Sequence, residues 1–321
     1  MPATASPDLT ALVRRHAAAV GADDPLTARR AEAEYARCCW SGGHRTPGEL
    51  SDDLSGAFHD LRRNAASVLG LDKESHDSAM TWAGWAMTRG DGPSALRARA
   101  RLVLDEAIRW ARHVDDGTGS ADIPDVPLLG RIVNELPARE GDPSPAAEPA
   151  PPSLVDAALR VEEAATLVRR TDISAPLANW LRDQSEAPGA GNLVDTVTLM
   201  DARTLRTAGD LPAAARMCAR ALREPVGEPV TAGFKFRLEL ADYSIMAGHD
   251  DTAARLLDEA AADAGEAGLP LQRLTAVRAA IPVFHRLGAA RRLRDMSRDL
   301  VDSLDGMPDS PAIRDVRAAA R

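Results

Sequence analysis

Apolar residues recur every three or four positions over most of this chain, and the pattern is clearest between residues 192 and 225. Val197 and Met200 share one side of a first segment, and Cys218 and Leu222 share one side of a second. This spacing is typical of an α-helix and not of a β-strand. The stretch therefore predicts two helices that pack as a hairpin.

The residues between these two segments predict a tight turn. Gly209 can adopt the positive φ that ends a helix, and Asp210 can cap the helix that follows. Pro212 falls in the first helical turn, where its missing N–H costs no hydrogen bond. The order of glycine, capping residue and proline is thus the one expected between consecutive helices.

The same features return farther along the chain at a nearly constant interval. Gly209 is followed by Gly248 after 39 residues and by Gly288 after another 40. The tripeptide Leu-Val-Asp at residues 154–156 also returns after 39 residues, at 193–195. Separate features with one period predict an array of helical hairpins, and residues 309–320 predict a final capping helix.

The first clear hairpin resembles a tetratricopeptide repeat, in which small residues occupy fixed places on two packed helices and Gly-Asp forms the turn. The residues that carry this resemblance are Ala202, Leu205, Gly209, Asp210, Ala214, Ala221 and Leu222, followed in the next hairpin by Ala241, Gly248, Ala253 and Ala260. The third hairpin keeps Gly288 but has Leu293 where a small residue is usual. The resemblance implies stacked hairpins with a concave wall.

The N-terminal half resembles the tetratricopeptide repeats of kinesin-light-chain-like proteins. Residues 19–27, Ala-Val-Gly-Ala-Asp-Asp-Pro-Leu-Thr, are similar to the segment between repeats of that family. Gly21 is expected to end one helix there, and Asp24 with the following proline to begin the next. Many repeats of that family bind a peptide backbone through an Asn of the first helix, but Thr81 and Glu34 occupy the matching positions.

Composition favours an all-α fold, because only 3% of the residues are aromatic and the apolar residues are mainly alanine, leucine and valine. A Pro/Ala/Glu-rich stretch at 139–152 predicts a linker. The predicted domains are an N-terminal helical array at 1–138 and a C-terminal array with its capping helix at 153–321. The fold prediction is an all-α solenoid of helical hairpins in two arrays.

Candidate catalytic and metal-binding groups are sparse, so the sequence predicts neither an enzyme nor a cofactor. Cys38, Cys39 and His44 are too few for a tetrahedral zinc site. His285 lies beside an apolar residue and is expected to be packed or to cap a helix. Trp82 and Trp85 lie three residues apart and predict either a core between repeats or an exposed stacking surface.

Charge, cysteine content and the lack of long apolar runs limit the possible partners and the cellular compartment. The net charge of −9 disfavours binding to nucleic acid and to anionic membranes. Three scattered cysteines do not form a disulfide framework, and no apolar run reaches the length of a membrane span. These features predict a soluble cytoplasmic protein, while its oligomeric state stays open.

The tetratricopeptide resemblance implies a partner-binding site on the concave wall. The candidate residues at the matching positions are Leu199, Arg203, Arg206, Lys235, Asp242 and Met246. Two arginines and a lysine would suit an acidic partner protein or peptide, although such charges can also be simply solvated. We therefore expect a non-catalytic scaffold or adaptor, with a regulatory sensor for a small peptide or metabolite as the alternative.

Overall fold

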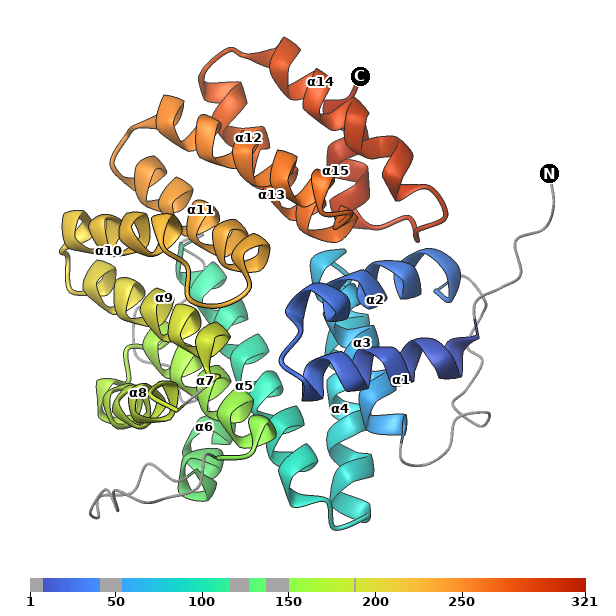
Figure 1. Ribbon diagram of the computed structural model, residues 1–321, viewed down its shortest axis with the longest axis vertical. Helices are drawn as coiled ribbons and strands as arrows, with labels where there is room; N and C mark the ends of the chain where they lie inside the picture. The colour runs from blue at the N-terminus through green and yellow to red at the C-terminus, as the bar shows by residue number, and fades with distance from the viewer. Residues whose placement is uncertain (1–7, 41–53, 116–126, 137–149, 188) are drawn as a thin grey trace. The chain divides into compact units, whose positions relative to one another are not determined.

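The computed structural model describes residues 8–40, 54–115, 127–136, 150–187 and 189–321. Throughout these ranges the chain folds into α-helices with short 3₁₀ segments and without a β-strand, as the sequence predicts (Figure 1). Helices that follow one another along the chain pack against each other. The all-α fold and its construction from sequential helices are thereby confirmed.

The helices form two compact units, one made of Met1–Ser75 with Asp201–Arg321 and the other of His76–Met200. This grouping differs from the predicted arrays at 1–138 and 153–321. Helix α5 (Gly92–Asp115) packs along α7 (Pro152–Leu167), so helices on both sides of the predicted linker share one core. Most of the predicted linker, residues 139–149, lies outside the described residues, and its linker character stays a prediction.

The unit formed by residues 76–200 is built around the α5 and α7 pair. Its other elements are most of α4 (Asp72–Thr88), α6 (Pro127–Ile132), the 3₁₀ segment Val133–Glu135, α8 (Thr171–Ser185) and the start of α9 (Gly191–Thr207). Ala100 on α5 and Ala157 and Ala164 on α7 are fully buried. Small side chains let two helix backbones approach closely, which explains the long contact between α5 and α7.

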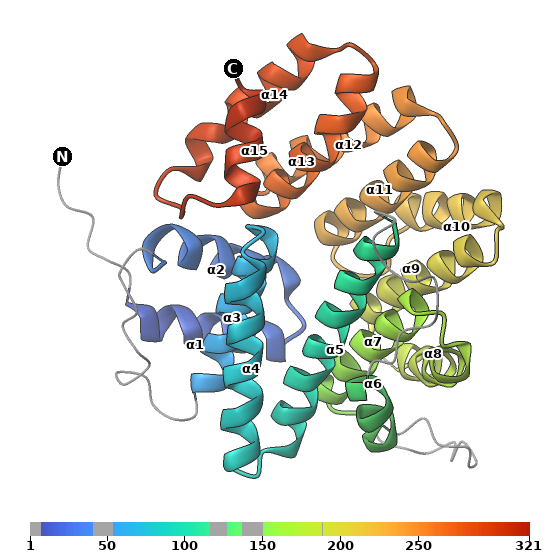
Figure 2. The same ribbon diagram turned by 180° about the vertical axis from the view of Figure 1, so that it is seen from behind.

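The second unit joins the first helices of the chain to the last ones. It contains α1 (Leu9–Gly21), α2 (Pro25–Cys38), α3 (Ser55–Val68), α10 (Leu211–Arg223), α11 (Pro229–Met246), α12 (Asp250–Glu266), α13 (Pro270–Arg286), α14 (Ala290–Val301), the 3₁₀ segment Asp302–Leu304 and α15 (Pro311–Ala319). Helices α2 and α3 both contact α13 (Figures 1 and 2). The backbone N–H of Ala312 donates to the carbonyl of Leu69 over 3.3 Å, which ties α15 to the end of α3.

The predicted turn between α9 and α10 forms as expected. Gly209 has a φ of +87°, and the Asp210 carboxylate accepts a hydrogen bond from the N–H of Ala213 over 3.0 Å. Gly248 and Gly288 also have positive φ values. A non-glycine residue would be strained in this left-handed region, so the regular spacing of the glycines marks the turns of successive hairpins.

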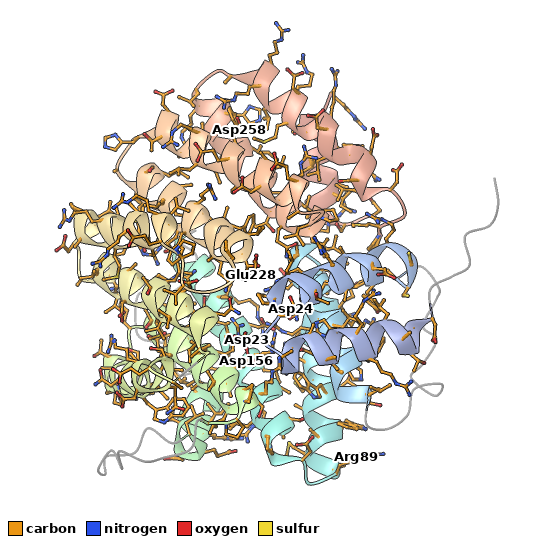
Figure 3. All side chains as sticks on the ribbon, in the orientation of Figure 1. Asp23, Asp24, Arg89, Asp156, Glu228 and Asp258 are labelled. Carbon is orange, nitrogen blue, oxygen red and sulfur yellow. The ribbon has the colours of Figure 1, made fainter. Side chains whose placement is uncertain are left out.

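The predicted end of α1 at Gly21 is confirmed, but the left-handed residue of the turn lies two positions later. Helix α1 continues through Gly21, and Asp23 adopts the positive φ, at 52°. Aspartate tolerates this conformation better than most residues, because its short polar side chain can form local hydrogen bonds. Asp24 then caps α2 by accepting from the N–H of Thr27 over 3.0 Å, as expected, and Glu228 caps α11 in the same way (Figure 3).

The small residues of the repeat pattern lie in close helix contacts. Ala202, Ala214, Ala241, Ala253 and Ala260 have no accessible surface. At the corresponding place of the third hairpin the larger Leu293 is also buried, with 2% exposure. The small-residue pattern of the first two hairpins therefore matches positions where a larger side chain has no room.

We expect Ala214→Leu and Ala253→Leu each to reduce stability by about 1–3 kcal/mol, because added methylene groups overpack a filled contact. Thermal melts of the purified full chain would measure the effect. Ala262→Leu is the matched control, since Ala262 lies on the same helix as Ala253 but is exposed. Equal melting temperatures for the buried and exposed substitutions would contradict the assigned packing.

Candidate functional site

The predicted groove residues Arg203 and Arg206 converge on a carboxylate from the neighbouring hairpin. Arg203 Nε donates to Glu239 Oε2 over 2.9 Å, and Arg206 Nη1 lies 3.9 Å from Glu239 Oε1. The Glu239 side chain is only 6% exposed. The two arginines thus bind a buried acid of the same chain, which reduces the positive charge that they can offer to a partner.

The surroundings of Glu239 are acidic and aromatic as well as basic. The Arg206 guanidinium lies 6.0 Å from the centre of the Tyr243 ring. Desolvation by the surrounding protein, followed by the Glu239 carboxylate, raises the pKa of Asp242 above its usual value. Burial, again with a contribution from Glu239, raises the pKa of the Cys218 thiol to about 12 and keeps it protonated.

The other predicted groove residues have unequal access to solvent. Met246 is 60% exposed and Asp242 is exposed, whereas Lys235 is partly buried and has interactions of its own. Leu199 is 6% exposed and belongs to the compact unit of residues 76–200, where it is a buried residue. Whether these residues bind a partner stays a prediction, and buried Leu199 is the least suited to that role.

Sequence reasoning missed Glu239, although its position carried a signal. Lys235, Glu239 and Asp242 follow one another at intervals of four and three residues, so they lie on one face of α11. This spacing could have shown that Glu239 lies on the same helix face as the predicted residues Lys235 and Asp242. Its pairing with α9, however, depends on how the hairpins pack.

The remaining candidate residues are the two tryptophans of α4 and the possible metal ligands. Trp82 is 2% exposed and belongs to the core between α4 and α5, which agrees with the core alternative. Trp85 is partly buried, with the guanidinium of Arg89 5.0 Å from its ring. Among the described residues, no group of three or more His, Cys, Asp or Glu side chains is placed to hold a metal ion. His44 lies outside those residues.

A groove of about 990 Å³ lies between α3, α13, α14 and α15. The groove is lined by Ser67, Val68, Thr275, Arg278, Ala279, Ile281, Pro282, His285, Ala290, Leu293, Arg294, Asp315, Ala318, Ala319 and Arg321. Most of these side chains are small or apolar. His285 is exposed in this groove and is not packed in the core, contrary to expectation.

The charged residues of this groove are mostly basic. Arg278 Nε and Nη2 both lie 3.2 Å from Asp315 Oδ2, so these two opposite charges are paired. Within the described ranges, the side chains of Arg294 and Arg321 form no hydrogen bond or ion pair. The groove therefore combines an apolar lining with an excess of positive charge, in a chain whose net charge is −9.

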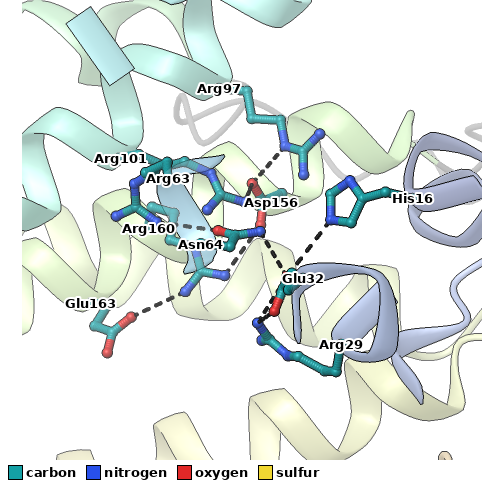
Figure 4. A network of polar contacts seen from close by, with 10 residues as sticks. All are labelled: His16, Arg29, Glu32, Arg63, Asn64, Arg97, Arg101, Asp156, Arg160 and Glu163. Atoms are coloured by element: carbon teal, nitrogen blue, oxygen red, sulfur yellow. Dashed lines mark hydrogen bonds and ion pairs between the residues drawn. The ribbon is translucent and has the colours of Figure 1, made fainter. Parts of the chain in front are cut away.

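In each unit an acid away from these surfaces also links two helices (Figure 4). In one, Glu32 receives a hydrogen bond from Arg29 Nη1 over 2.8 Å and another from Asn64 Nδ2 over 3.0 Å, and it is 2% exposed. Burial alone would raise the pKa of Glu32, but the charge of Arg29 and the hydrogen bonds outweigh it and lower that pKa. Glu32 thus joins helices α2 and α3 as a structural acid.

In the other unit, Asp156 on α7 meets three arginines (Figure 4). Its carboxylate accepts from Arg97 Nε over 2.8 Å and from Arg101 and Arg160 over 3.3 Å each. Burial opposes ionisation, but the three cations hold the pKa of Asp156 well below its usual range. Because Arg97 and Arg101 belong to α5, this ionised carboxylate links α5 to α7.

The fold and these surfaces define an all-α protein of packed helical hairpins. In the part of the chain that the structure describes, no helix combines the length and apolar character needed to cross a bilayer. Comparison with protein-family models and with curated proteins gave no match. The resemblance to tetratricopeptide repeats consequently rests on the residue pattern of the chain itself.

Proposed function

We propose that this protein is a non-catalytic interaction scaffold that binds a segment of a partner protein in the groove between α3, α13, α14 and α15. The observation that carries the proposal is the groove itself, about 990 Å³ in volume, with a largely apolar lining that includes charged side chains of α13, α14 and α15. Grooves of this kind between helices commonly receive peptide segments or single helices.

The chemistry of the lining favours a protein segment over a small metabolite. A small-molecule site usually brings a few polar groups together around one ligand. Here Arg278 and Asp315 are paired with each other, Arg294 comes from a third helix, and alanine, isoleucine and proline side chains provide much of the remaining surface. Several apolar side chains of a partner can contact such a lining at the same time.

The groove is also a better candidate than the predicted wall on α9 and α11. At that wall a partner carboxylate would compete with buried Glu239 for Arg203 and Arg206. In the groove, the charge of Arg294 is not compensated by an ion pair among the described residues. A partner that pairs with Arg294 does not have to displace an internal acid first.

The experiment places a photo-crosslinking amino acid at Ala290, which is exposed and lines the groove. The matched control carries the same amino acid at the next residue, Arg291, which is exposed but not part of the lining. After irradiation in the producing cells, mass spectrometry identifies the crosslinked segments. We expect one segment to be captured from position 290 and to be much rarer from position 291.

The captured segment is then synthesised and titrated against the purified full chain. Ala290→Trp should weaken its binding by about tenfold or more, because the indole fills part of the groove, whereas Arg291→Trp should have little effect. If crosslinks from the two positions are the same, or if Ala290→Trp binds the segment normally, the groove is not the binding site.

A further inference from the structure

We infer that the groove between α3, α13, α14 and α15 selects an acidic amphipathic helix. This inference rests on the proposed function and specifies the chemistry of the bound segment. It follows from three properties of the lining: its sign of charge, its shortage of groups for a peptide backbone, and the length of the α13 face that it presents.

Charge complementarity gives the sign of the partner. The lining contains three arginines and one aspartate, and the aspartate is paired with Arg278. Arg294 supplies positive charge that no acid in the described ranges pairs with. A basic surface on a chain with a net charge of −9 attracts acidic segments, while the rest of the molecule tends to repel them.

The helix ends at the groove do not reverse this sign. The first turn of α14 contributes Ala290, and the last turns of α3, α13 and α15 contribute Val68, His285 and Ala319. A helix terminus acts as about half an elementary charge, positive at the N-terminus and negative at the C-terminus. These partial charges fall off within one helical turn and are screened by solvent, so they weaken the attraction of Arg294 for a carboxylate but do not remove it.

The lining offers few partners for the backbone of an extended peptide. The Thr275 hydroxyl donates to the carbonyl of Leu271 over 3.1 Å, and Arg278 is paired with Asp315. Pro282 has no N–H, so the carbonyl of Arg278 lacks its helical donor and supplies one spare acceptor. Each buried backbone group without a hydrogen-bond partner destabilises a complex. A helix avoids this cost, because it satisfies its own backbone.

The face of α13 that lines the groove is also long enough to contact a short partner helix. Thr275, Arg278, Pro282 and His285 follow the spacing of one helix face and all line the groove. At 1.5 Å per residue, the ten steps from Thr275 to His285 cover about 15 Å. This distance matches about three turns of a partner helix, whose apolar side chains would lie over Ile281 and whose acidic side chains would reach Arg294.

The test uses three synthetic fluorescent peptides of equal length and the purified full chain. One has leucines on one helix face flanked by glutamates, the second replaces the glutamates by lysines, and the third scrambles the first so that no apolar face remains. By fluorescence anisotropy, we expect the glutamate peptide to bind about tenfold or more tighter than either of the others. Its affinity should fall with added salt, because exposed charges are screened.

Variants of α14 connect this selectivity to the groove. Arg294→Glu should weaken binding of the glutamate peptide by about tenfold or more, and Arg294→Gln should weaken it less, because the first reverses a charge and the second removes it. Arg291→Glu is the matched control, since it changes the same net charge on the same helix outside the groove lining. Circular dichroism melts verify that each variant is folded.

Several results would overturn the inference and still leave the proposed function testable. Equal binding of the glutamate and lysine peptides, equal binding of the scrambled peptide, absence of binding, or an unchanged affinity of Arg294→Glu would each rule out an acidic helix as the ligand. If crosslinking from Ala290 still captures a segment whose binding Ala290→Trp abolishes, the scaffold function holds with another kind of segment. If that capture also fails, both proposals fail.

Discussion

Replacement of Asp156 by alanine is expected to lower the free energy of unfolding by about 3–5 kcal/mol, the range found when one partner of a buried ion pair is removed. Asp156 is 19% exposed, and Arg101, one of its three partners, is 5% exposed. Without the carboxylate, the positive charges of Arg97, Arg101 and Arg160 remain close together in the contact between α5 and α7. Urea denaturation of the full chain would measure the loss.

Two comparisons show whether the effect comes from the charge of Asp156. Asp172→Ala is the control, because the pair that Asp172 forms with Arg170 is exposed and should contribute little. Asp156→Asn keeps the shape and removes the charge. Because the folded-state pKa of Asp156 is depressed, its contribution to stability is present above the unfolded pKa of about 3.9 and is lost as the pH falls below it.

The difference in stability between wild type and Asp156→Asn should therefore be largest near neutral pH and shrink on acidification below about pH 4. The reverse dependence, or a stability of Asp156→Ala equal to that of Asp172→Ala, would contradict the structural role of the carboxylate. Because the other carboxylates titrate in both proteins, only the difference between the two curves is informative.

Charge reversal of both arginines of the predicted wall on α9 and α11, Arg203→Glu with Arg206→Glu, is expected to destabilise the fold by about 2–4 kcal/mol. The two new carboxylates would face buried Glu239 and the nearby Asp242, whose pKa burial and Glu239 already raise. Loss of a fully buried partner costs about 3–5 kcal/mol, but Arg203 and Arg206 are about one-third exposed, so solvent screens part of the effect. Thermal and urea melts would measure it.

The matched control for this variant is Arg216→Glu with Arg220→Glu, a double reversal on exposed positions of α10. It changes the net charge equally and should leave the melting temperature nearly unchanged. Adding Glu239→Gln to the Arg203 and Arg206 reversal should restore part of the stability, because it removes the central carboxylate. If the reversal melts like wild type, the ion pairs with Glu239 contribute nothing to the fold.

This expectation changes how binding by these arginines can be tested. From the sequence alone, reversal of Arg203 and Arg206 should weaken partner binding without affecting the fold, because solvated charges contribute little to stability. The contacts with Glu239 mean that the same reversal can impair binding through the fold. Arg294 is the better probe, since its side chain lines the groove and has no ion pair among the described residues.

Local features of the chain were determined by the sequence itself. Gly209 and Asp210 form the predicted turn, and Ala214 and Ala253 are fully buried at the predicted small positions. These features could be predicted because helical periodicity, capping and positive φ depend on residues within a few positions of one another. At the end of α1, Gly21 is the last helical residue as predicted, and Asp23 adopts the left-handed conformation.

Contacts between distant segments were decided only by the tertiary structure. The packing of α5 on α7, the pairing of Arg203 with Glu239 and the position of α3 beside α13 each join segments that no local pattern connects. The groove arises from the last of these contacts, because α3 at one end of the sequence and α13 to α15 at the other form its walls. Periodicity shows which face of a helix is buried, but the identity of the partner depends on how all the faces fit together.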